Sequence, residues 1–356
     1  MLKRFSFAFP FLVCPCASAL AQQEIYPSLS GEVSIELQND WAYRSDDRAN
    51  LNNDLYTTTE PSLTVRLSPS WSVFAHAVLE PVTPPDPFEN RVFGDHGLYM
   101  EDLFVEYAPE PFYLRAGKMN VGFGIAWDEA PGIYGGDFAE DGYETAERIG
   151  VGGGWTMDAA GFGRHRVSAA TFFLDTTILS QSVLRGRGDT RRRDGGVSNT
   201  EDFSSYIVAL DGGRVAGLGK LAYHAAWMHQ AKGQGDAAAE DSVALALHTS
   251  IDLGNGVVVA PLVEYVHQDS PGGAADAERD FLTLAGQLVR GGYNVAVAWT
   301  RRETRGAAEN DDYQLQISAG YSFAFGLAVD IGWKLAEEAD VETRTLGALA
   351  TYRLEF

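Results

Sequence analysis

Residues 345–356 alternate between two kinds of side chain with a period of two. Counting back from the terminus, one set is wholly apolar and comprises Phe356, Leu354, Tyr352, Ala350, Ala348 and Leu346. The intervening set is mostly polar or small and comprises Glu355, Arg353, Thr351, Leu349, Gly347 and Thr345. Two is the side-chain period of a β-strand, so this stretch is predicted to be a strand with one apolar face. Such a strand suits a soluble sandwich or a wall between lipid and water.

The same alternation returns along the chain from Leu29 onward. Units of about ten alternating residues are joined in turn by a tight turn and by a longer polar loop, which is the pattern of an up-and-down barrel. About sixteen strands are predicted, at residues 29–39, 56–67, 71–80, 98–108, 112–118, 147–158, 165–175, 203–211, 219–230, 241–252, 257–268, 280–290, 293–303, 311–323, 327–337 and 345–356. For the strand at 165–175 the sequence does not separate an inner face from an outer face.

A sandwich would not need short and long connections to alternate strictly across sixteen strands, and the hydropathy of the chain is compatible with a membrane barrel. Hydrophobic residues make up 45% of the chain, yet the mean hydropathy is −0.14, so apolar residues are dispersed. Beyond residue 21 no window approaches the ~18 apolar residues of a membrane helix. A chain of this kind is expected to enter a membrane only as strands closed into a barrel. Aromatic residues near the predicted strand ends suit interfacial girdles: Trp71, Tyr107, Phe112, Trp155, Tyr206, Tyr293, Trp299, Tyr313, Phe323, Tyr352 and Phe356.

Residues 1–21 have the pattern of a secretory signal peptide. Lys3 and Arg4 precede an apolar stretch at 5–19, and Ala19 and Ala21 form a small-x-small cleavage site. The expected domains are therefore a signal peptide at 1–21 and a barrel at 22–356. The only cysteines, Cys14 and Cys16, lie inside the leader, so the mature chain is expected to have no disulfide and no thiolate metal site.

The closing strand with its terminal Phe356 resembles the last strand of Gram-negative outer-membrane β-barrels. In strand count, connectivity and terminal aromatic residue the chain resembles the general diffusion porins. The resemblance implies a transmembrane antiparallel up-and-down barrel in the outer membrane, surrounded by lipid and lipopolysaccharide. It also implies recognition of Phe356 by the barrel-assembly machinery, periplasmic termini and a possible homotrimer. The segments 99–107 and 115–118 also look like strands of larger porin-like families, and eighteen-stranded, substrate-specific relatives are often monomers.

A barrel of this size is wide enough to hold a water-filled channel. The residues that alternation turns inward are small or polar: Gly150, Gly152, Gly154, Ala244, Ala246, Ser250, Gln314, Gln316, Ser318 and Gly320. The expected function is therefore a porin that passes small hydrophilic solutes and ions by passive diffusion. A substrate-selective, monomeric porin-like channel is the alternative.

The loop at 119–146 is the longest acidic loop and the third long loop in the chain. In general diffusion porins the third surface loop folds into the barrel, and its acidic residues face a basic cluster on the wall. By position, the resemblance implies constriction residues Asp128, Glu129, Asp137, Glu140, Asp141 and Glu144 on this loop. The matching wall residues, which alternation turns inward, are Arg66, Arg115, Lys118 and Arg148. Opposed charges across a water-filled gap would select solutes by charge and size.

Other functional classes are less well supported by the sequence. No Ser/His/Asp set suggests a barrel-embedded hydrolase, so no catalytic residue and no cofactor are predicted. The inward histidines His76, His224 and His248 lie on separate strands without metal-site spacing, so no metal ligand is predicted. The formal net charge of −22 argues against nucleic acid as a partner and favours a weak preference for cations. A surface adhesin remains a further alternative.

Overall fold

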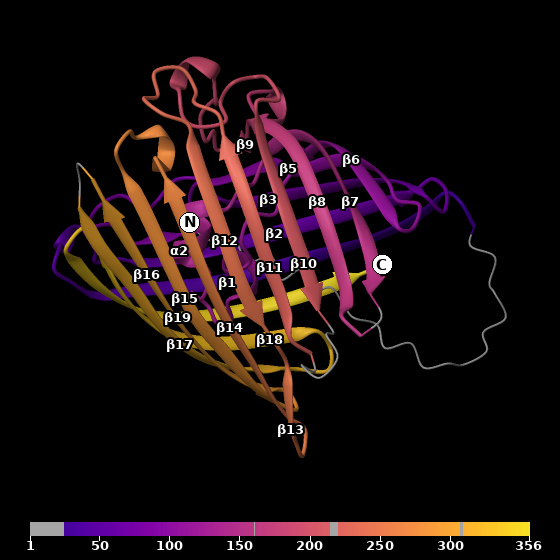
Figure 1. The fold of residues 1–356 in the computed structure, drawn as a ribbon. Helices are drawn as coiled ribbons and strands as arrows, with labels where there is room; N and C mark the ends of the chain where they lie inside the picture. Colours follow the sequence, from indigo (N-terminus) through magenta and orange to yellow (C-terminus); the bar gives the residue numbers. More distant parts are fainter. Residues whose placement is uncertain (1–24, 160, 214–219, 307–308) are drawn as a thin grey trace.

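The computed structural model describes residues 25–159, 161–213, 220–306 and 309–356. The signal peptide expected at residues 1–21 lies outside these residues. The strands belong to one sheet that closes on itself as an antiparallel barrel of sixteen strands (Figure 1).

The sixteen barrel strands are β1 (Ser28–Ser45), β2 (Asn53–Arg66), β3 (Trp71–Pro81), β5 (His96–Tyr107), β6 (Phe112–Met119), β7 (Arg148–Ala159), β8 (Gly163–Leu174), β10 (Ser205–Gly213), β11 (Ala222–Gln230), β12 (Glu240–His248), β14 (Val257–Asp269), β15 (Glu278–Arg290), β16 (Tyr293–Arg305), β17 (Asn310–Ser322), β18 (Leu327–Glu338) and β19 (Val341–Glu355). Three short strands are additional. They are β4 (Arg91–Val92), β9 (Val183–Leu184) and β13 (Ile251–Gly254), and β13 extends the line of β12 along β14.

The short helices lie in the connections between strands: η1 (Arg48–Asn50), α1 (Ala126–Glu129), α2 (Asp137–Tyr143), η2 (Ile178–Ser180), η3 (Arg192–Asp194) and η4 (Pro271–Gly273). Within the described part of the chain, no helix has the length and apolar character needed to cross a membrane.

The barrel closes where β1 pairs with β19. The two strands are antiparallel, with Val33 opposite Leu354 and Leu37 opposite Ala350. The ladder extends to the last residue, because the amide of Phe356 donates to the carbonyl of Gly31 at 3.0 Å. A Cβ at Gly31 would lie 2.6 Å from the ring of Phe356, so only glycine lets the two chain ends approach this closely.

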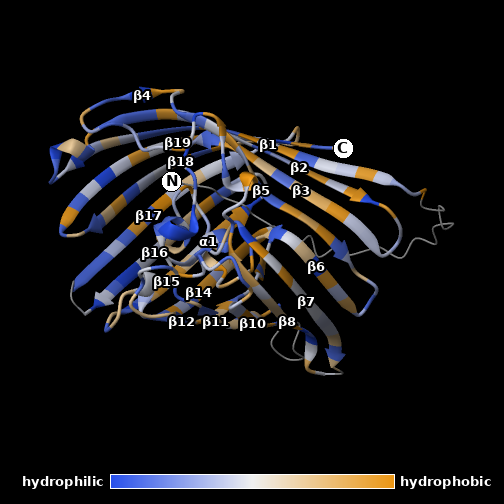
Figure 2. Cartoon of the chain, turned by 90° about the horizontal axis from the view of Figure 1, so that it is seen from above, coloured by the Kyte–Doolittle hydropathy of each residue, from blue (hydrophilic) through white to orange (hydrophobic). Residues whose placement is uncertain are grey.

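The two faces of the wall differ as the period-two pattern predicts. Side chains such as Leu37, Val151 and Leu245 are exposed on the outer face, whereas Ser34, Gln38 and Gln316 are buried inside the barrel. Figure 2 shows the resulting alternation of apolar and polar residues along the strands. Exposed apolar side chains around the whole wall are the pattern of a barrel that faces lipid.

Aromatic pairs lie on the outer face near both rims of the barrel. Near the rim with the tight turns, Trp71 lies 4.7 Å from Tyr107, and Tyr293 lies 4.7 Å from Tyr321, between ring centroids. Near the rim with the long loops, the rings of Tyr206 and Trp227 are 5.3 Å apart. These pairs match the predicted girdles, which place amphipathic rings at the two membrane–water interfaces.

All sixteen predicted strands are present, with ends shifted by a few residues. Three of the predicted connections differ. The last connection is a tight turn at the loop rim, because Ala339 and Asp340 both adopt positive φ (50° and 63°) and β19 therefore begins at Val341. The loops before β5 and β10 also carry β4 and β9, which pair with β2 and β5 respectively.

Candidate functional site

The connection between β6 and β7, residues 120–147, lies inside the barrel. It carries α1 and α2, and Figure 2 shows α1 within the ring of strands. Most of its apolar side chains are buried, and the buried ones are Phe123, Ala126, Ala130, Ile133, Tyr134, Phe138, Ala139 and Tyr143. We refer to residues 120–147 as the inner loop. It is held to the barrel wall at two places of different character.

The first attachment, the buried anchor, is formed by Phe123, Tyr143 and Phe281 around Glu264. Tyr143 packs edge-on against Phe123 (6.2 Å) and against Phe281 of β15 (5.1 Å), between ring centroids. The same apolar cluster includes Phe172, Met228 and Val266 from the wall. Burial of large apolar side chains on both sides makes this contact resemble a protein core.

Glu264 of β14 is the polar centre of the buried anchor. Its carboxylate accepts hydrogen bonds from the backbone amides of Ile125 (2.5 Å) and Ala126 (2.9 Å). It also accepts a hydrogen bond from the hydroxyl of Tyr143. The side chain is 1% exposed, so these donors replace water around a buried acceptor. One wall residue therefore binds both the start of α1 and the end of α2.

The second attachment, the polar anchor, is formed by Tyr134 and Asp137 with Asp40 and Lys334. The hydroxyl of Tyr134 donates to Asp40 of β1 at 2.5 Å, and Lys334 of β18 lies 3.0 Å from a carboxylate oxygen of Asp137. The ammonium of Lys334 also lies 4.4 Å from the centroid of the Tyr134 ring. Two glutamines of β17 add direct hydrogen bonds, from Gln314 to the carbonyl of Tyr134 (2.5 Å) and from Gln316 to the carbonyl of Pro131 (2.8 Å).

The six predicted loop acids occupy different environments. Asp128 and Glu129 lie in α1, where Glu129 is 3.9 Å from His248, and Glu144 accepts from the side chain of Asn120 at 3.1 Å. Asp137, Glu140 and Asp141 lie in α2, and Asp137 is 3.0 Å from Lys334 on the opposite wall.

Of the four predicted wall bases, Arg148 interacts electrostatically with the predicted loop acid Glu144. Arg66 is exposed at the end of β2, at the turn rim, and Arg115 pairs with Glu106 of β5 at 2.5 Å. Lys118 is buried against Asp175 (2.7 Å) and Glu147 (2.8 Å). Arg148 donates to the carbonyl of Ala146 at 2.8 Å. The inner loop thus pairs with the predicted Lys118 through Glu147, and also with Lys334, which was not among the predicted residues.

A charged cluster joins the inner loop to the loop between β8 and β10. Glu147 accepts from Arg187 at 2.7 and 2.5 Å and from Lys118 at 2.8 Å. Burial raises the pKa of the Glu147 carboxyl, but hydrogen bonds and charges from Arg187 and Lys118 outweigh it, so the pKa lies below its ordinary value. Glu147 is therefore a carboxylate at neutral pH and ties two loops together. We call Glu147, Arg187 and Lys118 the loop clasp.

A cavity of about 180 Å³ remains inside the barrel beside the polar anchor. Its lining includes the acids Asp40, Asp54 and Glu80 and the bases Arg91 and Lys334. Arg91 binds Asp54 through two nitrogens, at 2.8 and 2.5 Å. Acidic and basic side chains thus face the same space, with one acid in excess.

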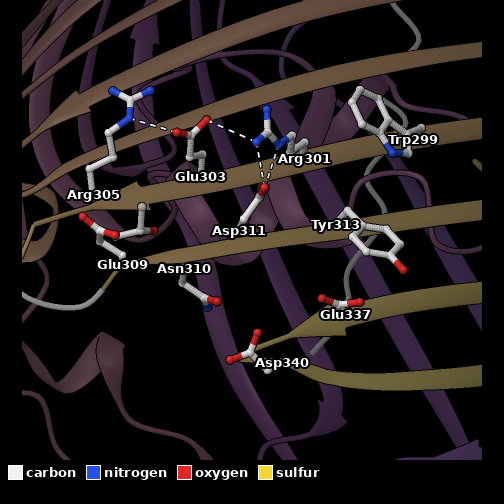
Figure 3. A pocket seen from close by; sticks show the side chains of 11 residues that line it. Trp299, Arg301, Glu303, Arg305, Glu309, Asn310, Asp311, Tyr313, Glu337 and Asp340 are labelled. Atoms are coloured by element: carbon white, nitrogen blue, oxygen red, sulfur yellow. Dashed lines mark hydrogen bonds and ion pairs between the residues drawn. The ribbon is translucent and has the colours of Figure 1, made fainter.

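A larger hollow of about 720 Å³ lies on the outer face at the loop rim, where β16, β17 and β18 meet. Figure 3 shows Arg301 between Glu303 and Asp311, with Arg305 also directed to Glu303. Arg301 is 2.6 Å from Asp311, and Arg305 is 2.9 Å from Glu303. Arg301 thus pairs with Asp311 of β17, and Arg305 also pairs with Asp280 of β15, so this cluster braces the outer rim.

Sequence reasoning missed the residues that hold the inner loop. Glu264 and Lys334 each interrupt the inward face of a predicted strand with a charge, and that interruption is the signal available in the sequence. Their partners lie far away along the chain, at sequence separations of 138 residues for Ala126 and Glu264 and 197 residues for Asp137 and Lys334. Such residues are in contact only in the folded barrel, so the sequence alone does not reveal that they pair.

Comparison with protein-family models finds no match, and comparison with curated proteins finds none either. Solved structures do resemble the chain. OprB of Pseudomonas putida has a TM-score of 0.65 at 6% identity, over 92% of this chain and 94% of that one. The outer membrane channel DcaP of Acinetobacter baumannii has a TM-score of 0.61 at 10% identity, over 92% and 96%. OpdK of Pseudomonas aeruginosa, solved with vanillate, has a TM-score of 0.54 at 8% identity, over 92% and 99%. The chain thus shares its barrel fold with these proteins.

Proposed function

We propose that this chain is an outer-membrane porin, which forms a water-filled channel for passive diffusion of small hydrophilic solutes and ions. The observation that carries the proposal is a closed sixteen-stranded barrel, apolar outside and polar inside, with a loop folded into its lumen. Eight-stranded barrels fill their interior with wall side chains, whereas sixteen strands leave room for a channel. The fold likeness to an outer membrane channel supports the same function.

The inner loop is the proposed constriction of this channel. It is attached to the wall opposite its own root, so the remaining passage runs past the polar anchor and the 180 Å³ cavity beside it. Asp40, Asp137 and Lys334 would then present opposed charges to a passing solute. With acids in excess along the cavity, the channel is expected to favour small cations weakly.

The side chains on the outer face of the barrel support the proposed membrane environment. Its apolar wall and two aromatic girdles fit the lipid and lipopolysaccharide of a Gram-negative outer membrane. Recognition of Phe356 by the barrel-assembly machinery and assembly into a homotrimer are parts of the same proposal. No catalytic step is assigned to the chain.

Single-channel recording in planar bilayers tests the proposal. The folded protein, checked by its heat-sensitive migration in gels, should give discrete steps of ion current. Reversal potentials under a salt gradient should show a small preference for cations. Folded protein that inserts into the bilayer without any current would refute the channel function.

A further inference from the structure

Three potential metal ligands meet on the inner face of the wall formed by β3 and β5. His76, Glu101 and Asp102 each offer one ligand atom, and these atoms all lie within 4.8 Å of one another. His76 lies directly across from Asp102 in the ladder, and its Nδ1 is 3.5 Å from a carboxylate oxygen of Asp102. Among the described residues of the chain, this is the only group of its kind.

A β-bulge brings the two carboxylates together. Consecutive residues of a regular strand point to opposite faces, so Glu101 and Asp102 would normally lie on different sides of the wall. Here the register shifts, because His76 pairs with Asp102 while Ala77 pairs with Met100, which leaves Glu101 as the extra residue. Bulges of this kind redirect side chains and are common next to functional sites.

The group is buried to a degree that is uncommon for ionisable side chains. His76 is 2% exposed, Glu101 is 5% exposed and the side chain of Asp102 is 14% exposed. A divalent cation held between these side chains would be attracted by both carboxylates and would use all three ligand atoms at once.

The chemistry of the ligands narrows the class of metal. One imidazole nitrogen with two carboxylate oxygens suits a first-row transition ion such as Zn²⁺, whereas Mg²⁺ prefers oxygen ligands alone. A tetrahedral ion with bonds of about 2.1 Å keeps its ligand atoms about 3.4 Å apart, so a small inward rotation of the side chains closes the site. We propose that His76, Glu101 and Asp102 form a binding site for a divalent transition-metal ion, with a fourth position open to water.

The site is connected to the root of the inner loop. The backbone amide of Asn120 donates to Oδ1 of Asp102 at 3.1 Å, one residue after β6 ends. A contact of this kind fixes the orientation of a metal-binding carboxylate from outside the coordination sphere. A metal ion here would therefore stabilise the segment from which the inner loop departs. Metal binding at this site is measured without ion flow, so this proposal is tested independently of the proposed channel function.

Titration calorimetry of the folded full chain in detergent tests the site with ZnCl₂ and with MgCl₂. The expected result is one Zn²⁺ site per chain and binding of Mg²⁺ at least about tenfold weaker. The variants His76→Ala, Glu101→Gln and Asp102→Asn should each weaken Zn²⁺ binding roughly tenfold to a hundredfold. His224→Ala is the matched control, because His224 is also buried in the wall and pairs with Asp211 at 2.8 Å. This control should keep the affinity of the unchanged protein.

A second measurement uses only the unchanged protein, so it tests the site even if a variant fails to fold. Co²⁺ added in place of Zn²⁺ should give the visible absorption of a four- or five-coordinate nitrogen and oxygen site, and Zn²⁺ should displace it. Absence of Zn²⁺ binding, or binding that survives in all three variants, would overturn the proposal.

Discussion

The two anchors of the inner loop differ in what surrounds them. At the buried anchor, Glu264 and the rings of Tyr143 and Phe281 are enclosed by wall and loop. At the polar anchor, Asp137 and Lys334 lie beside a cavity lined by further charges. Under the proposed function, the buried anchor would hold the loop in place and the polar anchor would present charge to the passage. The following predictions separate these roles.

Deletion of Phe356 should have the largest effect, because both anchors require a closed barrel. Phe356 extends the β1–β19 ladder through two backbone hydrogen bonds with Gly31, at 2.9 and 3.0 Å. The amount of barrel in cell membranes should fall sharply, while the channels that do assemble should conduct normally. Quantitative blotting of outer-membrane fractions measures the first effect, and Phe356→Tyr is the control. Normal amounts of the truncated protein would contradict this role.

Glu264→Ala should release the inner loop from the wall. The change removes the acceptor for two backbone amides and a tyrosine hydroxyl, and each hydrogen bond to a charged group contributes about 1.5–3 kcal/mol. The single-channel step should rise roughly twofold, with more current noise, because the passage widens. Glu264→Gln keeps one acceptor oxygen, so its single-channel step should lie between those of the unchanged protein and of Glu264→Ala. A step equal to that of the unchanged protein would show that Glu264 does not hold the loop.

Lys334→Gln should change selectivity more than conductance. The substitution removes the cation beside Asp137 and leaves Asp40 and Asp137 to dominate the passage. Under a tenfold salt gradient the reversal potential should move by about 5–10 mV toward cation selectivity. Lys334→Arg keeps the charge and should behave like the unchanged channel. A shift toward anions would contradict the assignment of the polar anchor to the passage.

Acid pH should open the loop clasp, with the smallest effect of the four. The folded pKa of Glu147 lies below its ordinary value, so the carboxylate stabilises the clasp at pH above about 4.3, the usual glutamate pKa. That contribution is lost as pH falls through the folded pKa, when protonation removes the pairing with Arg187 and Lys118.

Limited proteolysis with an acid-active protease measures this opening. Cleavage between β8 and β10 should accelerate at pH 3.5 relative to pH 6, and Glu147→Gln should be cleaved quickly at both values. Equal rates at the two values in the unchanged protein would show that Glu147 does not control this loop.

The barrel was predictable from the sequence, whereas the anchors were not. Alternation of lipid-facing and lumen-facing residues is a local signal, and it located all sixteen strands within a few residues of their ends. The last strand was predicted to start at residue 345 and not at Val341, because the positive φ values of the preceding turn come from Ala339 and Asp340 and not from glycine. The roles of Glu264, Lys334 and the group at His76 depend on contacts between distant strands or on a bulge. Neither of these features produces a periodic pattern in the sequence.

Replacing residues 122–144 of the inner loop by a short Gly-Ser linker shows whether this loop constricts a channel. Single-channel steps of this variant and of the unchanged protein are compared in the same bilayer and salt. If the inner loop constricts a water-filled channel, the unchanged protein conducts and the shortened variant gives a distinctly larger step with weaker charge selectivity. Steps of equal size and selectivity in the two folded proteins would contradict the account.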